Sequence, residues 1–126
     1  MTERTGADGF DVDDSLEQMA QLVGTEERRT FFERRPQLIT AECVKLVCTE
    51  VARQVQIDAE KALELAAAAR HIAERLDDGP SRALAARAAA NAHLVSVVFR
   101  LAKRIYGQAL DLFLALGADA AADVTR

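Results

Sequence analysis

Apolar residues recur every three or four positions along most of this chain, which places them on one face of an α-helix. The first such segment starts within residues 13–15, each of which can cap a helix, and Gly24 is expected to end it. A second helix is predicted over residues 25–35, because Pro36 stops it. The apolar stripe of the first helix consists of Leu16, Met19, Ala20 and Val23.

Two longer helices follow this pair. Thr40, with an acid two residues later, is a typical helix start. The stripe that follows it consists of Val44, Val47, Cys48, Val51 and Val55. Asp58 is expected to cap the next helix, whose stripe consists of Ala62, Leu65, Ala69, Ile72 and Leu76. The sequence Asp-Asp-Gly-Pro-Ser at 77–81 predicts a turn that ends this helix, with Ser81 capping the next one.

The last segment carries the longest regular pattern. Its seam positions alternate in steps of four and three: Leu84, Ala88, Asn91, Val95, Val98, Ala102, Ile105, Ala109, Leu112 and Leu116. This heptad spacing predicts one continuous helix over residues 81–116, ended by Gly117, with Asn91 as the polar seam residue that fixes the register of a partner helix. Because such a helix leaves apolar seam uncovered, we expect the protein to be a homo-oligomer.

These segments predict an all-α fold, either an antiparallel helical bundle or a short α-hairpin array of four to five helices with a long last helix. Residues 1–12 carry two glycines among charges and no apolar periodicity, so they are expected to form a disordered arm. Residues 13–117 are then a single helical domain, and residues 118–126 a frayed tail.

Composition narrows the function. The net charge of −4 and the pI near 5.2 argue against a nucleic-acid-binding protein. The acidic start has no signal-peptide pattern and no apolar run could span a membrane, so we expect a cytoplasmic protein without a membrane partner. Cys43 and Cys48 point to different sides of one helix and are expected to be reduced thiols.

Two groups of basic residues, together with Asn91, are the candidate partner-binding positions. The first group surrounds Phe31 and Phe32, and the second lies in the last helix; their members are Arg28, Arg29, Arg34, Arg35, Arg100, Lys103 and Arg104. Either group could contact phosphates of a nucleic acid. The interpretation we favour is structural: cations near a helix C-terminus for the first, and a solvated helix face for the second.

No catalytic pattern is present. His71 and His93 lack metal-ligating residues at helical spacing, and the chain has no glycine-rich phosphate loop or nucleophile elbow. We therefore predict a non-enzymatic module for protein–protein interaction or oligomerisation, without catalytic residues, cofactor or metal. One alternative is a phosphotransfer bundle with His71 as the phosphoryl acceptor, although Glu74 stands where such domains carry Lys.

The order of elements resembles that of bacterial tetratricopeptide-repeat proteins. The stretch 31–76, FFERRPQLITAECVKLVCTEVARQV followed by AEKALELAAAARHIAERL, resembles the helical segment that precedes such repeats. Residues 85–125 resemble a degenerate repeat, with Tyr106, Ala109, Leu110 and Phe113 matching its second helix and residues 114–119 its closing turn. The resemblance implies an adaptor or scaffold that binds a protein partner, and a turn near residues 100–103 instead of one continuous helix.

Overall fold

The structure, a computed structural model, describes the backbone of residues 12–125 and the side chains of residues 13–118. The described residues contain five α-helices, one 3-10 turn and no strand, which confirms the all-α prediction. The elements are α1 (Val12–Ala20), α2 (Gly24–Glu33), η2 (Pro36–Leu38), α3 (Ala41–Gln54), α4 (Ala59–Leu76) and α5 (Gly79–Thr125). They divide into two units, of which unit 1 ends at Val95 and unit 2 begins at Ser96. The predicted disordered arm, apart from Val12, lies outside the described residues.

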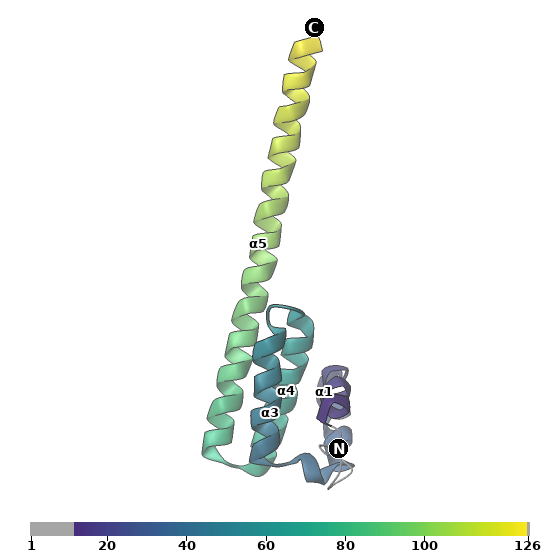
Figure 1. Ribbon diagram of the computed structural model, residues 1–126, viewed down its shortest axis with the longest axis vertical. Coiled ribbons are helices and arrows are strands. Elements are labelled where there is room, and N and C mark those ends of the chain that lie inside the picture. The colour runs from purple at the N-terminus through teal and green to yellow at the C-terminus, as the bar shows by residue number, and fades with distance from the viewer. Residues whose placement is uncertain (1–11, 126) are drawn as a thin grey trace, which may run out of the picture. The chain divides into compact units, whose positions relative to one another are not determined.

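The core of unit 1 lies between α3 and α4, which run antiparallel and side by side (Figure 1). Every residue of the predicted α3 stripe is buried, and Val44, Val47 and Val51 are completely so. The predicted α4 stripe is also buried, except that Leu76 is only partly covered. The buried surface of α4 is wider than predicted and also includes Ala66, Ala68 and Ala73, because α4 contacts α1 and α2 as well as α3.

The first part of α5 completes this core, but not with the residues that the heptad seam predicts. Ala85, Ala89 and Ala92 are the most deeply buried, whereas Leu84 is only partly buried and Asn91 is exposed. Asn91 therefore lies outside this core, and its predicted role in fixing the register of a partner helix stays a prediction. The buried positions differ from the seam because residues 85, 89 and 92 repeat the same steps of four and three one position later. Alanine permits a closer approach of helices than leucine or valine does, so these positions take the centre of the contact.

The turns of unit 1 are held by side-chain caps. Thr40 Oγ1 accepts a hydrogen bond from the amide of Cys43 at 3.0 Å, as predicted for the start of α3. At the 77–81 turn the predicted break is confirmed, and Asp77 takes the left-handed conformation (φ 55°). Ser81 is not the cap: Asp78 Oδ2 accepts from the amide and the hydroxyl of Ser81, at 3.1 and 2.7 Å. These hydrogen bonds also lower the pKa of the Asp78 carboxyl.

The link between α1 and α2 also differs from the prediction. Helix α1 ends at Ala20, and Gly24 (φ 84°) begins α2 instead of ending α1. The amide of Val23 donates to Glu27 Oε1 at 2.8 Å, which holds Val23 in an extended conformation before α2. Val23 is consequently exposed and does not belong to the apolar stripe, whereas Met19 is buried as predicted.

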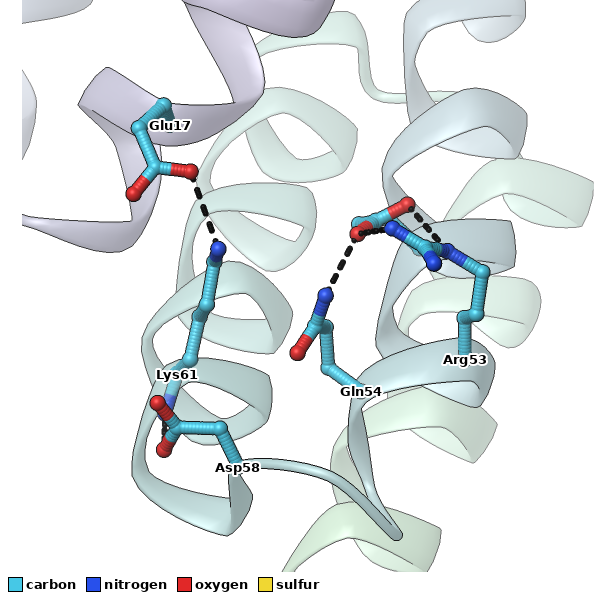
Figure 2. Close-up of polar contacts among 6 residues, drawn as sticks. Glu17, Arg53, Gln54, Asp58 and Lys61 are labelled. Carbon is cyan, nitrogen blue, oxygen red and sulfur yellow. Dashed lines mark hydrogen bonds and ion pairs between the residues drawn. The ribbon is translucent and has the colours of Figure 1, made fainter.

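One polar contact joins α1 to α4, and another group of contacts lies within the end of α3 (Figure 2). Lys61 Nζ at the start of α4 lies 2.9 Å from Glu17 Oε1 of α1, while Asp58 Oδ1 accepts from the amide of Lys61 at 3.1 Å. Within α3, Arg53 and the buried Gln54 both donate to the carboxylate of Glu50. The hydrogen bond from Arg53 is the main cause of the lowered pKa of Glu50.

Helix α5 is continuous over residues 81–116, which confirms the single-helix prediction, and no turn interrupts it at residues 100–103. The predicted end at Gly117 is wrong, because the helix continues to Thr125. A glycine inside a helix costs only about 1 kcal/mol relative to alanine. Four of the five residues after it, from Ala118 to Ala122, are alanines that favour the helix.

The buried face of α3 generates a stability prediction. Val51→Ala removes two buried methyl groups and leaves a cavity, so we expect the free energy of unfolding to fall by about 2 kcal/mol. Arg53→Ala on the exposed side of the same helix should change it by less than about 1 kcal/mol. Urea titration followed by circular dichroism measures both values, and equal midpoints for the two variants would show that this face is not the buried one.

Candidate interaction surface

The arginines around α2 are largely engaged within unit 1. Arg28 Nη1 lies 3.4 Å from Glu64 Oε1 of α4, and Arg29 forms an exposed ion pair with Glu26 at 3.0 Å. The guanidinium of Arg35 lies over the Phe31 ring, 4.1 Å from its centroid, and donates to the Phe31 carbonyl at 3.3 Å. Three of the four arginines therefore already have structural partners.

The remaining member of this cluster, Arg34, follows the end of α2 and is exposed. With Arg35 it lines a hollow of about 400 Å³ to which Glu26 and Glu27 also contribute. Carboxylates in the same hollow oppose the binding of a phosphate. The geometry thus favours the structural interpretation of this cluster over a nucleic-acid interface.

His71 lies inside unit 1, where its ring stacks on that of Phe32 (centroids 5.0 Å apart, planes at 17°). Its Nε2 is buried and has no hydrogen-bond partner among the described residues. Burial lowers the pKa of His71, and the nearby Arg75 and Arg28 lower it further. With its Nε2 buried and its pKa lowered, this imidazole is poorly placed to accept a phosphoryl group, so the geometry gives the phosphotransfer alternative no support.

The remaining candidate residues lie along α5. Asn91, in unit 1, is exposed at a groove of about 640 Å³ between α3 and α5, together with Lys45, Thr49 and Arg87. Arg100, Lys103 and Arg104 belong to unit 2 and are exposed, and none of them forms an ion pair with a described residue. The two predicted basic clusters are therefore in different units.

The most unusual surface is the apolar side of α5 in unit 2. Its heptad positions, beginning at Val98, are exposed or only half-buried, in contrast to the buried stripes of α3 and α4. We call this surface the α5 face and define it by Val98, Phe99, Leu101, Ala102, Ile105, Tyr106, Ala109, Leu112, Phe113 and Leu116. Monomeric proteins rarely expose contiguous apolar patches larger than a few hundred Å².

An aromatic row, missed in the sequence analysis, runs along one edge of this face. Phe99, Tyr106 and Phe113 are seven residues apart, so they lie above one another beside the heptad seam. Tyr106 is 75% exposed and Phe113 71%. Their seven-residue spacing was the available signal, and aromatic residues are enriched at protein interfaces.

Other kinds of site are not found in the described part of the chain. None of its helices combines the length and apolar character needed to cross a bilayer. No group of three or more His, Cys, Asp or Glu side chains within residues 13–118 is arranged to hold a metal ion.

The chain was compared with protein-family profiles, curated proteins and solved structures, and none of them matches it. The resemblance to tetratricopeptide-repeat proteins therefore remains a prediction from the residues that carry it.

The burial of His71 predicts a pH dependence of stability. The unfolded chain binds a proton at this position near pH 6.5, more readily than the folded chain, so the free energy of unfolding should fall as the pH drops from about 7 to 5. His71→Phe keeps a ring against Phe32 and removes the titration, so its stability should vary less over this interval. Thermal unfolding at several pH values tests this, with His93→Phe at an exposed position as the control.

Proposed function

We propose that this protein is a non-enzymatic oligomerisation module, in which two copies associate through the α5 face. The observation that carries the proposal is the exposed heptad seam flanked by the aromatic row. A continuous apolar stripe at heptad spacing is the surface with which helices bind one another. The four charged side chains between Ser96 and Ala118 all lie off this stripe.

The available area is sufficient for a stable dimer. An aromatic side chain can bury about 150–250 Å², and the three aromatic residues of the face are each half or more exposed. With the aliphatic side chains, the face offers on the order of 800 Å² per copy, the contribution of each partner to a standard interface.

Helix stability supports the same proposal. Isolated helices are marginally stable in water, and most helical stability in proteins comes from packing of an apolar face. The part of α5 in unit 2 has such a face, and its large apolar side chains are exposed. Association with a second copy would supply the packing that this segment lacks.

A cytoplasmic setting and a role as an adaptor complete the proposal. The free, buried thiols of Cys43 and Cys48 are typical of a reducing compartment, which supports a cytoplasmic setting. The tetratricopeptide-like residues would give the protein a role as an adaptor or scaffold, since repeats of that kind bind protein partners.

Substitutions on opposite sides of α5 test the proposal. Leu112 belongs to the face and Leu114 does not, although the two leucines are similarly exposed at 67% and 63%. Leu112→Glu should weaken self-association by at least about 30-fold, because a charge would be buried at the centre of the interface. Leu114→Glu should leave the affinity within about threefold of the wild type.

Sedimentation equilibrium over a range of concentrations measures the dissociation constants. The single tyrosine, Tyr106, offers a second readout, since its fluorescence should change as the dimer dissociates on dilution. A wild-type chain that stays at 13.7 kDa at millimolar concentration would contradict the proposal. Equal effects of the two glutamate substitutions would also contradict it.

A further inference from the structure

We infer that the two copies bind with antiparallel α5 helices. The twofold axis that relates the copies crosses the pair at the level of residue 107 along each helix. The inference rests on the proposed function and adds its direction and residue pairing.

Side-chain size along the seam is self-complementary about Gly107. One set of heptad positions holds Ala102 and Ala109, and the alternate set holds Ile105 and Leu112. In an antiparallel pair of helices, each position of one set faces the other set. With Gly107 at the centre, Ala102 faces Leu112 of the second copy, and Ile105 faces Ala109. Each inner layer then combines one small and one large side chain, which fills the space evenly.

The flanking residues fit the same axis. Antiparallel helices bring the same edge of both copies together, so the aromatic row faces itself. Tyr106 then lies beside Tyr106 of the second copy, and Phe99 beside Phe113. These pairs extend the apolar contact on one side of the seam, and aromatic pairs add about 0.5–1.5 kcal/mol beyond their area. On the opposite edge, Leu101 faces Ala115.

Charge also favours this direction. Arg100, Lys103 and Arg104 lie on the N-terminal side of Gly107, and Asp111 lies on its C-terminal side. Antiparallel pairing brings each basic cluster level with Asp111 of the other copy and separates the two clusters along the axis. A parallel pair would place the clusters at the same level, where like charges repel each other.

A parallel pair would also pack poorly. Each seam residue would face its own copy, so that Ala102 would meet Ala102 and Ala109 would meet Ala109. These two all-alanine layers, on either side of the larger Ile105 layer, would leave unfilled space, which is destabilising. Side-chain size therefore selects the antiparallel arrangement, and charge adds a weaker preference because the charged side chains lie off the stripe.

Cysteine cross-linking distinguishes the two directions. Val98→Cys and Leu116→Cys are made as separate variants and oxidised alone and as an equimolar mixture. In the antiparallel register residue 98 faces residue 116 of the other copy, whereas identical residues 98 are displaced along the axis by about 27 Å. A disulfide requires Cα atoms about 4.4–6.8 Å apart. The mixture should therefore give at least about tenfold more disulfide-linked dimer than either variant alone.

The native cysteines provide a low background in this experiment. Both are buried, and burial raises the pKa of the Cys43 thiol to about 11 and that of Cys48 above its ordinary value. Thiols with raised pKa values react slowly. The wild-type chain, oxidised under the same conditions, measures the disulfide formation that Cys43 and Cys48 still contribute.

A second variant leaves the apolar seam intact. Gln108 lies beside the proposed axis, so in the Gln108→Cys variant a short bismaleimide should link the cysteines at position 108 of the two copies.

The outcomes separate the inference from the proposed function. Efficient linkage of Val98→Cys alone would show a parallel pair and overturn the inference while leaving self-association standing. A dimer by sedimentation that no variant links would overturn the register. A monomer by sedimentation, with no linkage anywhere, would instead remove the proposed function itself.

Discussion

The close approach that alanine allows between helices is the interaction on which unit 1 depends. Helix α4 buries alanine on more than one side, and α5 contributes Ala85, Ala89 and Ala92 to the same core. Small side chains give little hydrophobic area each, so larger buried side chains such as Phe32, Leu65 and Ile72 supply more of the area and the alanines set the spacing. The caps at Thr40, Asp58 and Asp78 then satisfy the helix ends that this spacing brings together.

In unit 2 the apolar side chains of α5 differ in size and in exposure from those in unit 1. Beyond Val95 the seam carries valine, isoleucine and leucine at every position except Ala102 and Ala109, and an aromatic row is added beside it. Within the described residues these large side chains are exposed, although burying one fully is worth about 1.5–3 kcal/mol. The proposed second copy resolves this conflict, because the uncovered face then becomes the core of an interface.

The helices themselves were predictable from the sequence, since period, caps and Pro36 act locally. The stripes of α3 and α4 were also correct, because their valine, leucine and isoleucine positions leave one choice of face. The buried face of α5 was not predictable, because its alanines repeat the seam spacing one residue later and Asn91 could equally face inward or outward. The predictions that Gly24 and Gly117 each end a helix are wrong for a related reason. Whether a glycine ends a helix depends on its neighbours, here Glu27 and the alanines after Gly117. Arg28 and Arg35 have partners within unit 1 that depend on the fold, and the aromatic row becomes visible only when residues seven apart are taken together.

Hydrogen exchange at two protein concentrations tests the central claim most directly. If a second copy covers the α5 face, amides of residues 98–116 should exchange much more slowly well above the dissociation constant than well below it, because an unpaired helix opens readily. Amides of residues 44–51, which pack inside unit 1, should exchange at the same rate in both samples. Equal exchange of residues 98–116 at all concentrations would contradict the account.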